Sequence, residues 1–356
     1  MRTDDFSSFL VVRRDNIGDL VCTLPLISAL RHKYPKAFIA ALVNTYNCDV
    51  LAGHPDIDAV YAYSKGKHRT DGQTLLGVYW ARLRMLMNLR SRHFDCAILA
   101  APGEQPRALG YARWIRPRHI LGYVATGADP GGIDLAVHDE AQSQPHEVEK
   151  VFALLAPLGI AGPPPAARIA PSAQALGEVR DNILRAGLPG NGPLVALHIS
   201  ARKPSQRWSL ESFAQLARAL HARHRARFLL LWAPGGNDNP LHPGDDSKAE
   251  TLKKMLHDLP VLAYPTRQLA GLIAALAASD IVVCPDGGAM HLSAALGKPI
   301  VCLFGDSDPS RWRPWGVPQR VLQATSRDVA DISSAEVVTA VGELVSESGI
   351  GTVDPS

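Results

Sequence analysis

Short apolar runs alternate with helix-like patterns along this chain, and that alternation limits the folds it can adopt. Phe9 to Arg13 is typical of a buried strand, and residues 37–43 form a second apolar run. Between them, Leu20 to Tyr34 carries apolar residues at helical spacing, and Pro35 is expected to end that helix. A strand, a helix and a strand within about 35 residues predict a βαβ unit, which requires a parallel sheet.

The alternation continues along the chain, so the predicted fold class is α/β, with doubly wound parallel sheets. In the first half, further predicted elements are helices at 74–90 and 144–158 and a strand at 94–100. In the second half, the patterns predict strands at 193–200, 226–232, 261–263, 280–285 and 299–305, and helices at 209–224, 247–257, 267–278, 289–296 and 333–347.

Chain length and a break in composition predict two domains. Single cores usually stop growing at about 250–300 residues, and this chain has 356. The proline-rich stretch 159–173 excludes a continuous helix there. The predicted division is an N-terminal domain at 1–160, a linker at 161–173, a C-terminal domain at 174–330, and a C-terminal helix and tail at 331–356 that can pack back on the N-terminal domain.

The composition is that of a folded protein, with 46% hydrophobic and 20% charged residues. The N-terminus lacks the basic region of a signal peptide, and no apolar run approaches the roughly 20 residues of a membrane span, so we expect a cytoplasmic protein. The cysteines form no C-x-x-C pair, which indicates reduced core residues and not metal ligands. They are Cys22, Cys48, Cys96, Cys284 and Cys302.

Charge is spread unevenly along the chain. A net charge of +3 is too small to indicate a nucleic-acid partner. Residues 61–120, however, hold eleven Lys and Arg against three acids. This excess is consistent with an anionic partner, although solvated helix faces are the more common reason for such a run.

The first strand-to-helix turn, "RRDNIGD", ends in Gly18 and Asp19. Parallel sheets bind ligands beyond the carboxyl ends of their strands, so such turns are the places to look for chemistry. Asp19 is expected at or near the N-cap of the helix, where its carboxylate either caps the first turn or faces a ligand. The turn is neither a G-x-G-x-x-G dinucleotide motif nor a P-loop.

The second notable turn, "PDGGAMH", follows the predicted strand at 280–285. Gly287 and Gly288 allow backbone amides to approach a ligand at the start of a helix, which favours a diphosphate site. His291 would lie on the first turn of that helix, reaching the same anion or Asp286. A core or capping histidine is the alternative.

Two more turns carry polar side chains. "HISARKPSQRW" places Ser200, Lys203 and Arg207 beyond a strand, where cations can neutralise a leaving diphosphate without a metal. A solvated basic loop is the alternative. In "PGGNDNPLHPGDDSK", Asp245 or Asp246 can bind ribose hydroxyls, and we take Asp246 as the candidate.

Taken together, these motifs resemble glycosyltransferase family 9, the ADP-heptose:lipopolysaccharide heptosyltransferases. The resemblance rests on "R-x-D-N-I-G-D-x-x-x-x-x-P", the "R-W" turn, "D-G-G-A-M-H-L-x-x-A-L-x-x-P" and "F-G-D-S-D-P". It implies the GT-B fold, with two Rossmann-like domains around a cleft, the donor on the C-terminal domain and the acceptor on the N-terminal one. It also implies inversion at the anomeric carbon and no metal or other cofactor.

The resemblance implies roles for individual residues. Asp19 matches the catalytic base, and Ser200 matches a hydroxyl residue near the donor phosphates. The donor-binding motif corresponds to Asp286, Gly287, Gly288 and His291.

The sequence departs from the family pattern at three positions. Gly287 replaces the usual Thr or Ser, which removes a hydroxyl contact to the diphosphate. Gln206 stands where many members have lysine, and Lys203 or Arg207 is expected to substitute for it. Asp306 stands where proline is common, which puts the donor preference in doubt.

The acceptor side is less defined. Gly18, Lys65, Lys67 and Arg69 are the candidate acceptor contacts, and His146 resembles a family position without an assigned role. The expected acceptor is an anionic glycolipid, met by peripheral contact with the inner face of the inner membrane. The acceptor sugar, the linkage and the oligomeric state stay open.

The resulting prediction is an inverting, metal-independent transfer of heptose from ADP-heptose to a lipopolysaccharide core, with Asp19 as general base. One alternative is a related transferase that uses another nucleotide sugar or a different acceptor. A second alternative is a nucleotide-sugar-binding protein without activity. An NAD-dependent epimerase is disfavoured because G-x-G-x-x-G is missing from the sequence.

Overall fold

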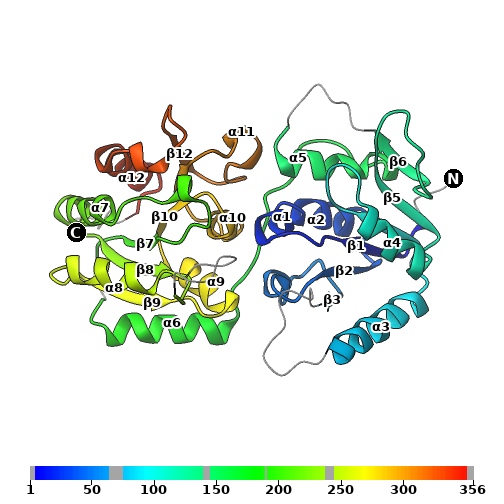
Figure 1. The fold of residues 1–356 in the computed structure, drawn as a ribbon, viewed down its shortest axis with the longest axis horizontal. Helices are drawn as coiled ribbons and strands as arrows, with labels where there is room; N and C mark the ends of the chain where they lie inside the picture. The colour runs from blue at the N-terminus through cyan, green and yellow to red at the C-terminus, as the bar shows by residue number, and fades with distance from the viewer. Residues whose placement is uncertain (1–4, 64–74, 139–144, 189–190, 237–243, 351–356) are drawn as a thin grey trace. The chain divides into compact units, whose positions relative to one another are not determined.

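The protein is described by a computed structural model that covers the chain except for residues 1–4, 64–74, 139–144, 189–190, 237–243 and 351–356 (Figure 1). The chain divides into two compact units, Met1–Ala167 and Arg168–Ser356. The boundary falls inside the segment predicted as the linker. Among the described residues, no helix combines the length and apolar character needed to cross a membrane.

The first unit contains a six-stranded sheet in the order β3-β2-β1-β4-β5-β6, with every neighbouring pair parallel. Its strands are β1 Ser8–Val12, β2 Phe38–Asn44, β3 Ala59–Tyr63, β4 Cys96–Leu99, β5 His119–Val124 and β6 Leu135–His138. Its helices are α1 Ile17–Val21, α2 Leu24–Lys33, α3 Leu75–Ser91, α4 Pro106–Ile115 and α5 Glu147–Phe152, with 3₁₀ turns at Cys48–Leu51 and Ala153–Leu158.

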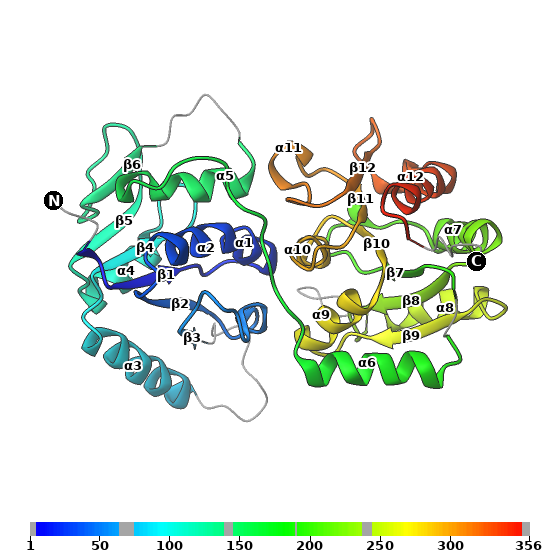
Figure 2. The same cartoon turned by 180° about the vertical axis from the view of Figure 1, so that it is seen from behind.

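Helices cover both faces of this sheet. Figures 1 and 2 show α1, α2 and α5 on one face and α3 and α4 on the other. The strands are apolar on both faces because both are covered, as expected for a parallel sheet. Leu10 and Leu42 of the sheet pack with Leu89 of α3 and Ala112 of α4 in one buried cluster.

The second unit repeats this architecture. Its strands are β7 Leu194–His198, β8 Arg227–Trp232, β9 Val261–Pro265, β10 Ile281–Pro285, β11 Ile300–Phe304 and β12 Gln319–Gln323, all paired in parallel. Its helices are α6 Ala173–Arg185, α7 Leu210–His224, α8 Asp246–Met255, α9 Leu269–Ala278, α10 Gly288–Ala295, α11 Pro309–Trp312 and α12 Ser334–Glu347, with 3₁₀ turns at Pro204–Gln206 and Val329–Asp331.

Both sheets have the same topology. The second sheet runs β12-β11-β10-β7-β8-β9. If the strands of each unit are counted from one to six, both orders read 3-2-1-4-5-6, the arrangement of Rossmann folds. The direction of winding reverses between the first and fourth strands, which are β1 and β4 in one unit and β7 and β10 in the other. The predicted fold class of two doubly wound parallel sheets is confirmed.

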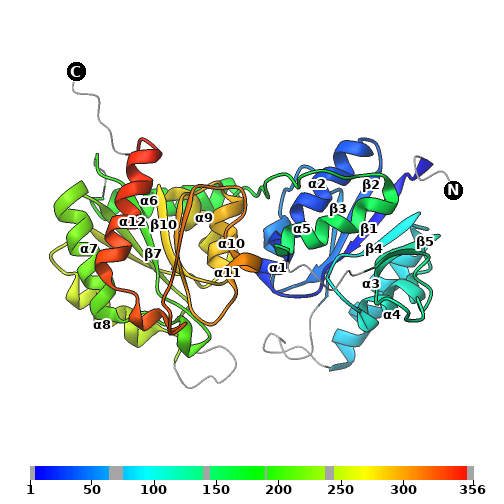
Figure 3. The ribbon, with the colours of Figure 1, turned by 90° about the horizontal axis from the view of Figure 1, so that it is seen from above.

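The C-terminal helix α12 belongs to the second unit. Val337, Val341 and Leu344 are buried in the same cluster as Leu216 and Leu220 of α7. The sequence left open which domain this helix packs on, and its apolar face is buried within the second unit. Figure 3 shows α12 beside α7.

Two predicted helices have different bounds in the structure. The helix expected at 20–34 begins earlier, at Ile17, and is split after Val21, because Pro25 lacks an N–H and fits only in the first turn of a new helix, α2. The helix expected at 144–158 changes to 3₁₀ geometry after Phe152, and Pro157 lies in that turn.

Several elements were missed because their apolar signal is weak. The edge strands β3, β6 and β12 are only partly buried, so their sequences lack long apolar runs. Helix α6 buries only Val179 and Ile183. All five cysteines are free thiols, as predicted, and four of them are buried.

Candidate functional site

The carboxyl end of the first sheet is organised around one buried cation. Arg13, which directly follows β1, is 2% exposed. Its Nη1 donates to the carbonyl of Ala100 beyond β4 (2.6 Å), so it bridges the two strands at which the winding reverses. Its Nη2 donates to Asp19 Oδ1 and to Glu147 Oε1, both at 2.9 Å. Arg13 Nε also lies 3.2 Å from Asp15 Oδ2, an ion pair without hydrogen-bond geometry.

The surrounding carboxylates balance the buried charge of Arg13. Burial alone would lower the pKa of Arg13, but attraction by Asp19, Glu147 and Asp15 together raises it above the ordinary arginine value. Burial also raises the pKa of the neighbouring Cys22 thiol, and Glu147 reinforces the effect. Cys22 is therefore a neutral thiol beside this charged cluster.

Asp19 is the third residue of α1, and Asn16 is the N-cap. Asp19 therefore lies near the N-cap, as predicted, three residues after it. The carboxylate does bond to the helix start, since Asp19 Oδ2 accepts from Asn16 N (2.9 Å) and from Asn16 Nδ2 (3.1 Å). Its side chain is 15% exposed. Among the described residues, Oδ2 thus has two donors and Oδ1 has one, which leaves an acceptor position on Oδ1.

Glu147 was not recognised from the sequence. It is 1% exposed and is the first residue of α5, placed there by the N-cap His146. His146 Nδ1 accepts from the Val148 amide (3.1 Å), and His146 N donates to Glu149 Oε2 (2.9 Å). His146 therefore has a structural role at this helix start. The adjacent glutamate carried no local signal, because its partner Arg13 is 134 residues away.

A second cation follows directly in sequence. The Arg14 guanidinium lies 4.8 Å from the ring centroid of Tyr111 and 5.3 Å from that of Tyr63, and Arg14 Nε donates to the Tyr63 hydroxyl. Arg82 also lies over the Tyr63 ring, at 5.6 Å. Burial raises the pKa of Tyr63, although the charge of Arg14 opposes this. Among the described residues, Arg14 has no carboxylate partner in an ion pair.

The remaining acceptor candidates lie on the same unit. Gly18 is the second residue of α1, directly before Asp19. Lys65, Lys67 and Arg69 fall outside the described residues.

In the second unit, the turn after β10 has a backbone conformation that favours glycine. Gly287 is the N-cap of α10, with φ +156° and ψ −165°, a region that other residues rarely adopt. A side chain there would meet nothing within 4 Å, so backbone conformation and not space requires the glycine. Gly288 then begins the helix.

Asp286 is joined to the loop after β7. Gln206 Nε2 donates to Asp286 Oδ2 (2.9 Å) and to Ser307 Oγ (3.2 Å). Burial raises the pKa of Asp286, and Asp306 adds to this, while Ser307, Lys203 and Gln206 oppose it. Gln206, which stands in place of the family lysine, thus connects three loops at the carboxyl edge.

His291 is buried in the first turn of α10. It is 5% exposed, and its ring meets the ring of Trp312 edge to face at 6.1 Å between centroids. This burial agrees with the alternative of a core histidine. Its sequence position near Asp286 does not by itself place the imidazole on a ligand.

Lys203 and Asp306 form an exposed ion pair across the same edge. Lys203 Nζ lies 3.1 Å from Asp306 Oδ1, which also accepts from the Ser205 hydroxyl (3.2 Å). The two charged side chains are 44% and 52% exposed. The hydrogen bond from Lys203 is the main reason that the pKa of Asp306 is lowered. Gly305 has no room for a side chain, since a Cβ would lie 2.3 Å from Ser205 O.

Arg207 and Ser200 support the loops of this edge. Arg207 donates to the carbonyls of Ala201 (3.2 Å) and Arg202 (3.3 Å), within its own loop. The Ser200 hydroxyl accepts from Ala233 N (2.9 Å), which ties the loop after β7 to the loop after β8. Lys203 is therefore the more available of the two candidate cations.

Asp246 holds the start of α8. Its two oxygens accept from Trp232 Nε1 (2.7 Å) and from Gly235 N (2.9 Å), and the bond from Trp232 is the main cause of its lowered pKa. The alternative, Asp245, is buried and pairs with Lys248 (2.5 Å). Of these two aspartates, Asp246 is the exposed one.

His198, at the end of β7, was missed by the sequence analysis. Burial lowers the pKa of His198 to about 4, and the charge of Asp245 opposes this only in part. Its Nδ1 is buried without a hydrogen-bond partner. His198 is therefore neutral at physiological pH.

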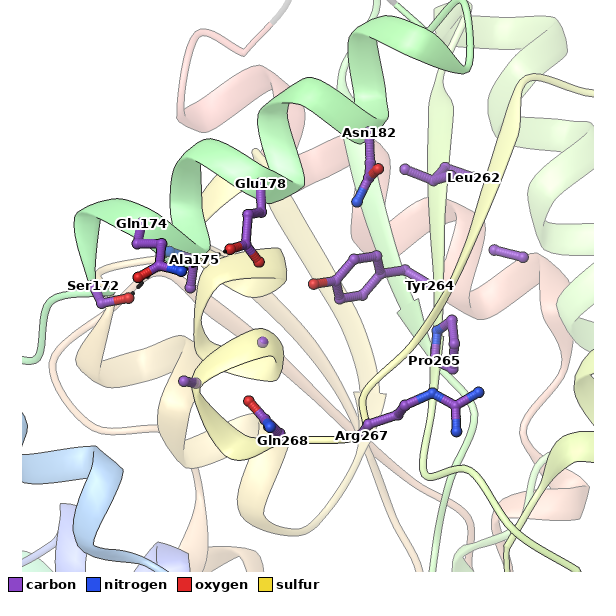
Figure 4. A pocket seen from close by; sticks show the side chains of 13 residues that line it. Ser172, Gln174, Ala175, Glu178, Asn182, Leu262, Tyr264, Pro265, Arg267 and Gln268 are labelled. Atoms are coloured by element: carbon purple, nitrogen blue, oxygen red, sulfur yellow. Dashed lines mark hydrogen bonds between the residues drawn. The ribbon is translucent and has the colours of Figure 1, made fainter.

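A pocket of about 640 Å³ lies between α6, β9 and α9. Figure 4 shows the Tyr264 ring pointing toward Glu178 and Asn182 of α6, with Arg267 and Gln268 at the end of β9. Burial raises the pKa of Tyr264, and Glu178 adds to the effect. The sequence did not reveal this pocket because α6 was not predicted.

Comparison with known proteins assigns the chain to a family. The model of glycosyltransferase family 9 (heptosyltransferase) matches residues 82–338. The chain belongs to glycosyltransferase family 9. It is therefore a glycosyltransferase, and the resemblance inferred from the motifs is confirmed.

The similarity to individual members of family 9 extends over nearly the whole chain. It is 23% identical to lipopolysaccharide heptosyltransferase 3 of Escherichia coli, over 94% of this chain and 98% of that protein. Among solved structures, it matches a family 9 glycosyltransferase from Veillonella parvula (18% identity, 98% of this chain and 99% of that one, TM-score 0.79). It also matches E. coli ADP-heptose lipopolysaccharide heptosyltransferase II (19%, 96% and 99%, TM-score 0.73). These structures show the shared GT-B fold.

Proposed function

We propose that this family 9 glycosyltransferase transfers heptose from ADP-heptose to a lipopolysaccharide core acceptor, with inversion and without a metal. The observation that carries the proposal is the Asp19 carboxylate, held at the carboxyl edge of the first sheet with one acceptor position left on Oδ1. The E. coli relative named for ADP-heptose supports the choice of donor.

The proposed reaction is a direct displacement. The acceptor hydroxyl gives its proton to Asp19 as its oxygen forms a bond to the anomeric carbon of the donor. The bond from that carbon to the diphosphate oxygen breaks, and ADP leaves with the electron pair. Attack opposite the leaving group inverts the anomeric centre.

The second unit is proposed to bind the donor. The turn at Asp286, Gly287 and Gly288 offers backbone amides at the start of α10, which suit a diphosphate. Lys203 supports a metal-independent departure of ADP, because its exposed pairing with Asp306 is easily exchanged for a phosphate. Ser200 and Asp246 are the proposed contacts to the donor phosphates and the ribose.

The first unit is proposed to bind the acceptor. Arg14 places a cation, which has no carboxylate partner among the described residues, beside two tyrosine rings, a combination that suits a phosphorylated saccharide. Gly18, Lys65, Lys67 and Arg69 stay predicted acceptor contacts. We propose that the acceptor is an anionic glycolipid, met at the cytoplasmic face of the inner membrane by surface contact.

A different nucleotide sugar is the second candidate donor. Asp306 lies beside Lys203, where the family commonly has proline, and adds a negative charge next to the proposed diphosphate site. An added charge at this position would change which donor binds and leave the displacement at the anomeric carbon unchanged.

The test combines binding and turnover. The protein is incubated with ADP-, UDP- and GDP-sugars, and the donor that raises the melting temperature most is identified, because a ligand of the folded state stabilises it. Acceptor-dependent release of the nucleotide is then measured with and without EDTA. We expect ADP-heptose to stabilise the protein and ADP release to be unchanged by EDTA. Preference for another nucleotide would reject the donor, and loss of activity in EDTA would reject the metal-independent mechanism.

A further inference from the structure

Glu147 is a buried carboxylate without a role in the proposed reaction, yet it shares one nitrogen with the proposed base. Arg13 Nη2 lies 2.9 Å from Glu147 Oε1 and 2.9 Å from Asp19 Oδ1, so its two hydrogens point to two carboxylates. We propose that Glu147 is a positioning residue: it fixes the guanidinium of Arg13, and Arg13 in turn orients the Asp19 carboxylate toward the acceptor hydroxyl. This inference rests on the proposed function, in which Asp19 is the base.

The guanidinium has little freedom to move. Arg13 and Glu147 are 2% and 1% exposed, and Arg13 Nη1 is held by the Ala100 carbonyl at 2.6 Å. An exposed arginine orients its partner poorly, because water and side-chain entropy compete with the pair. Here the planar fork of donors is fixed from two sides, so the position of Nη2 is set by Glu147 and Ala100.

The position of Glu147 is itself set by the start of α5. His146 caps this helix, with the Val148 amide donating to its ring and the Glu149 carboxylate accepting from its backbone N–H. Glu147, as the first helical residue, is therefore held between two capping contacts. A contact across 134 residues of sequence thus connects the end of β1 to α5.

The hydrogen bond from Arg13 decides where the free acceptor position of Asp19 points. Both donors of Asn16 bond to Oδ2, so Oδ1 is the oxygen with room for the acceptor hydroxyl. Arg13 is the donor to Oδ1 and sets the rotation of the carboxylate about its last bond. A general base must lie within about 2.6–3.2 Å of the proton it accepts, and a misplacement of about 1 Å can cost about a hundredfold in rate.

The experiment is a double-mutant cycle on kcat. Glu147→Gln keeps the size of the side chain and one acceptor oxygen but removes the charge that holds Arg13. It is measured in the wild type and in the Asp19→Asn background, with the nucleotide sugar that stabilises the protein and a lipopolysaccharide core acceptor. Glu149→Gln is the matched control. It removes an exposed charge on the same helix turn that does not bond to Arg13, and glutamine keeps an acceptor oxygen for the His146 backbone N–H, so the helix cap that places Glu147 is retained.

We expect Glu147→Gln to lower kcat only when Asp19 is present. Glu147→Gln lowers kcat by about ten- to a hundredfold with the KM of the donor unchanged, and Glu149→Gln has wild-type kcat. In the Asp19→Asn background Glu147→Gln causes no further loss, because the base that it positions has been removed. If Glu147→Gln does not fold, Glu147→Asp keeps the charge but is one methylene shorter, and the same pattern with a smaller loss is expected.

Two results would overturn the inference. One is wild-type kcat in both Glu147 variants. The other is an equal loss of kcat in both backgrounds, which would assign Glu147 a structural role only. A large effect of Asp19→Asn combined with either result rejects this inference and leaves the proposed function in place. Equal turnover of Asp19→Asn and wild type, or no turnover of any nucleotide sugar, rejects the proposed function and the inference with it.

Discussion

The two sheets have the same topology, but the cations at their carboxyl edges differ in burial. In the first unit, Arg13 is 2% exposed and lies among three carboxylates. In the second unit, Lys203 is 44% exposed and forms an ion pair with Asp306. A buried network fixes geometry, whereas an exposed pair can be exchanged for a ligand. The difference fits the proposed tasks, since a base must be aimed and a diphosphate must be able to enter and leave.

The ends of the first strands extend the comparison. Beyond β1, the buried charge of Arg13 is balanced by the carboxylates around it, which raise its pKa. At the end of β7, His198 is buried and is neutral instead, because its acidic neighbour Asp245 does not offset the desolvation. Burial therefore leaves an ion in one unit and a neutral side chain in the other, because the ordinary pKa of arginine is far above that of histidine and because several carboxylates face Arg13.

The largest expected effect is the difference in stability loss between variants of Arg13 and Lys203. Arg13→Met removes the partner of a buried glutamate, so it should destabilise the first unit by about 3–5 kcal/mol. Lys203→Met removes half of an exposed pair and should change stability by less than about 0.5 kcal/mol. Urea unfolding of both variants measures the difference. Equal losses in the two variants would show that the two edges do not differ in this way.

The next effect concerns pH and His198. The pKa of His198 is about 4 in the folded protein and about 6.5 in the unfolded chain, so the unfolded chain takes up the proton first as pH falls. Stability from this group is complete above pH 6.5 and is lost as pH falls toward 4. Between pH 7.5 and 5, His198→Asn should lose about 2 kcal/mol less stability than the wild type. The exposed His257→Asn is the control, and a wild-type pH dependence in His198→Asn would contradict the assignment.

A smaller effect tests the acceptor side. Arg14→Ala should raise the KM for a phosphorylated acceptor by roughly tenfold, because a charged hydrogen-bond donor is lost, while the KM of the donor stays unchanged. Initial rates at saturating donor measure it. Arg84→Ala, an exposed arginine on α3, should behave as the wild type. An increase in the KM of the donor for Arg14→Ala would contradict the assignment of Arg14 to the acceptor site.

The smallest effect tests the donor side. Asp306→Asn frees Lys203 from its ion pair, so ADP should bind about two- to fivefold more tightly, in line with the strength of an exposed pair. Titration calorimetry measures the dissociation constant. Asp308→Asn, the N-cap of α11, is the control in the same loop because Asp308 bonds to Ser310. Weaker ADP binding in Asp306→Asn would show that Asp306 assists the donor site.

The fold could be predicted from the sequence where burial is complete. The central strands β1, β7 and β10 are continuous apolar runs, since both faces are covered. Edge strands such as β3 and β12 are partly exposed and look like loops in sequence. The local sequence of α12 does not tell which domain the helix packs on, because its apolar face could cover either core. Only tertiary packing decides between them.

The candidate site was predictable only where it is local. Gly287 stands in a backbone conformation that favours glycine, so the turn motif in the sequence reports it directly. Asp19 could be placed at a helix start from its neighbours. Glu147 could not be recognised, and the contact of Gln206 with Asp286 could not be foreseen, because the partners Arg13 and Asp286 are 134 and 80 residues away.

Turnover by Asp19→Asn tests the central claim most directly. General-base catalysis contributes typically about 10²- to 10⁴-fold, so acceptor-dependent nucleotide release should fall by about that factor. Asn keeps the size of the side chain, and the turns proposed to bind the donor belong to the other unit. The melting-temperature shift caused by the donor should therefore equal that of the wild type. Near-wild-type turnover in Asp19→Asn, with donor binding intact, would contradict the assignment of Asp19 as the base.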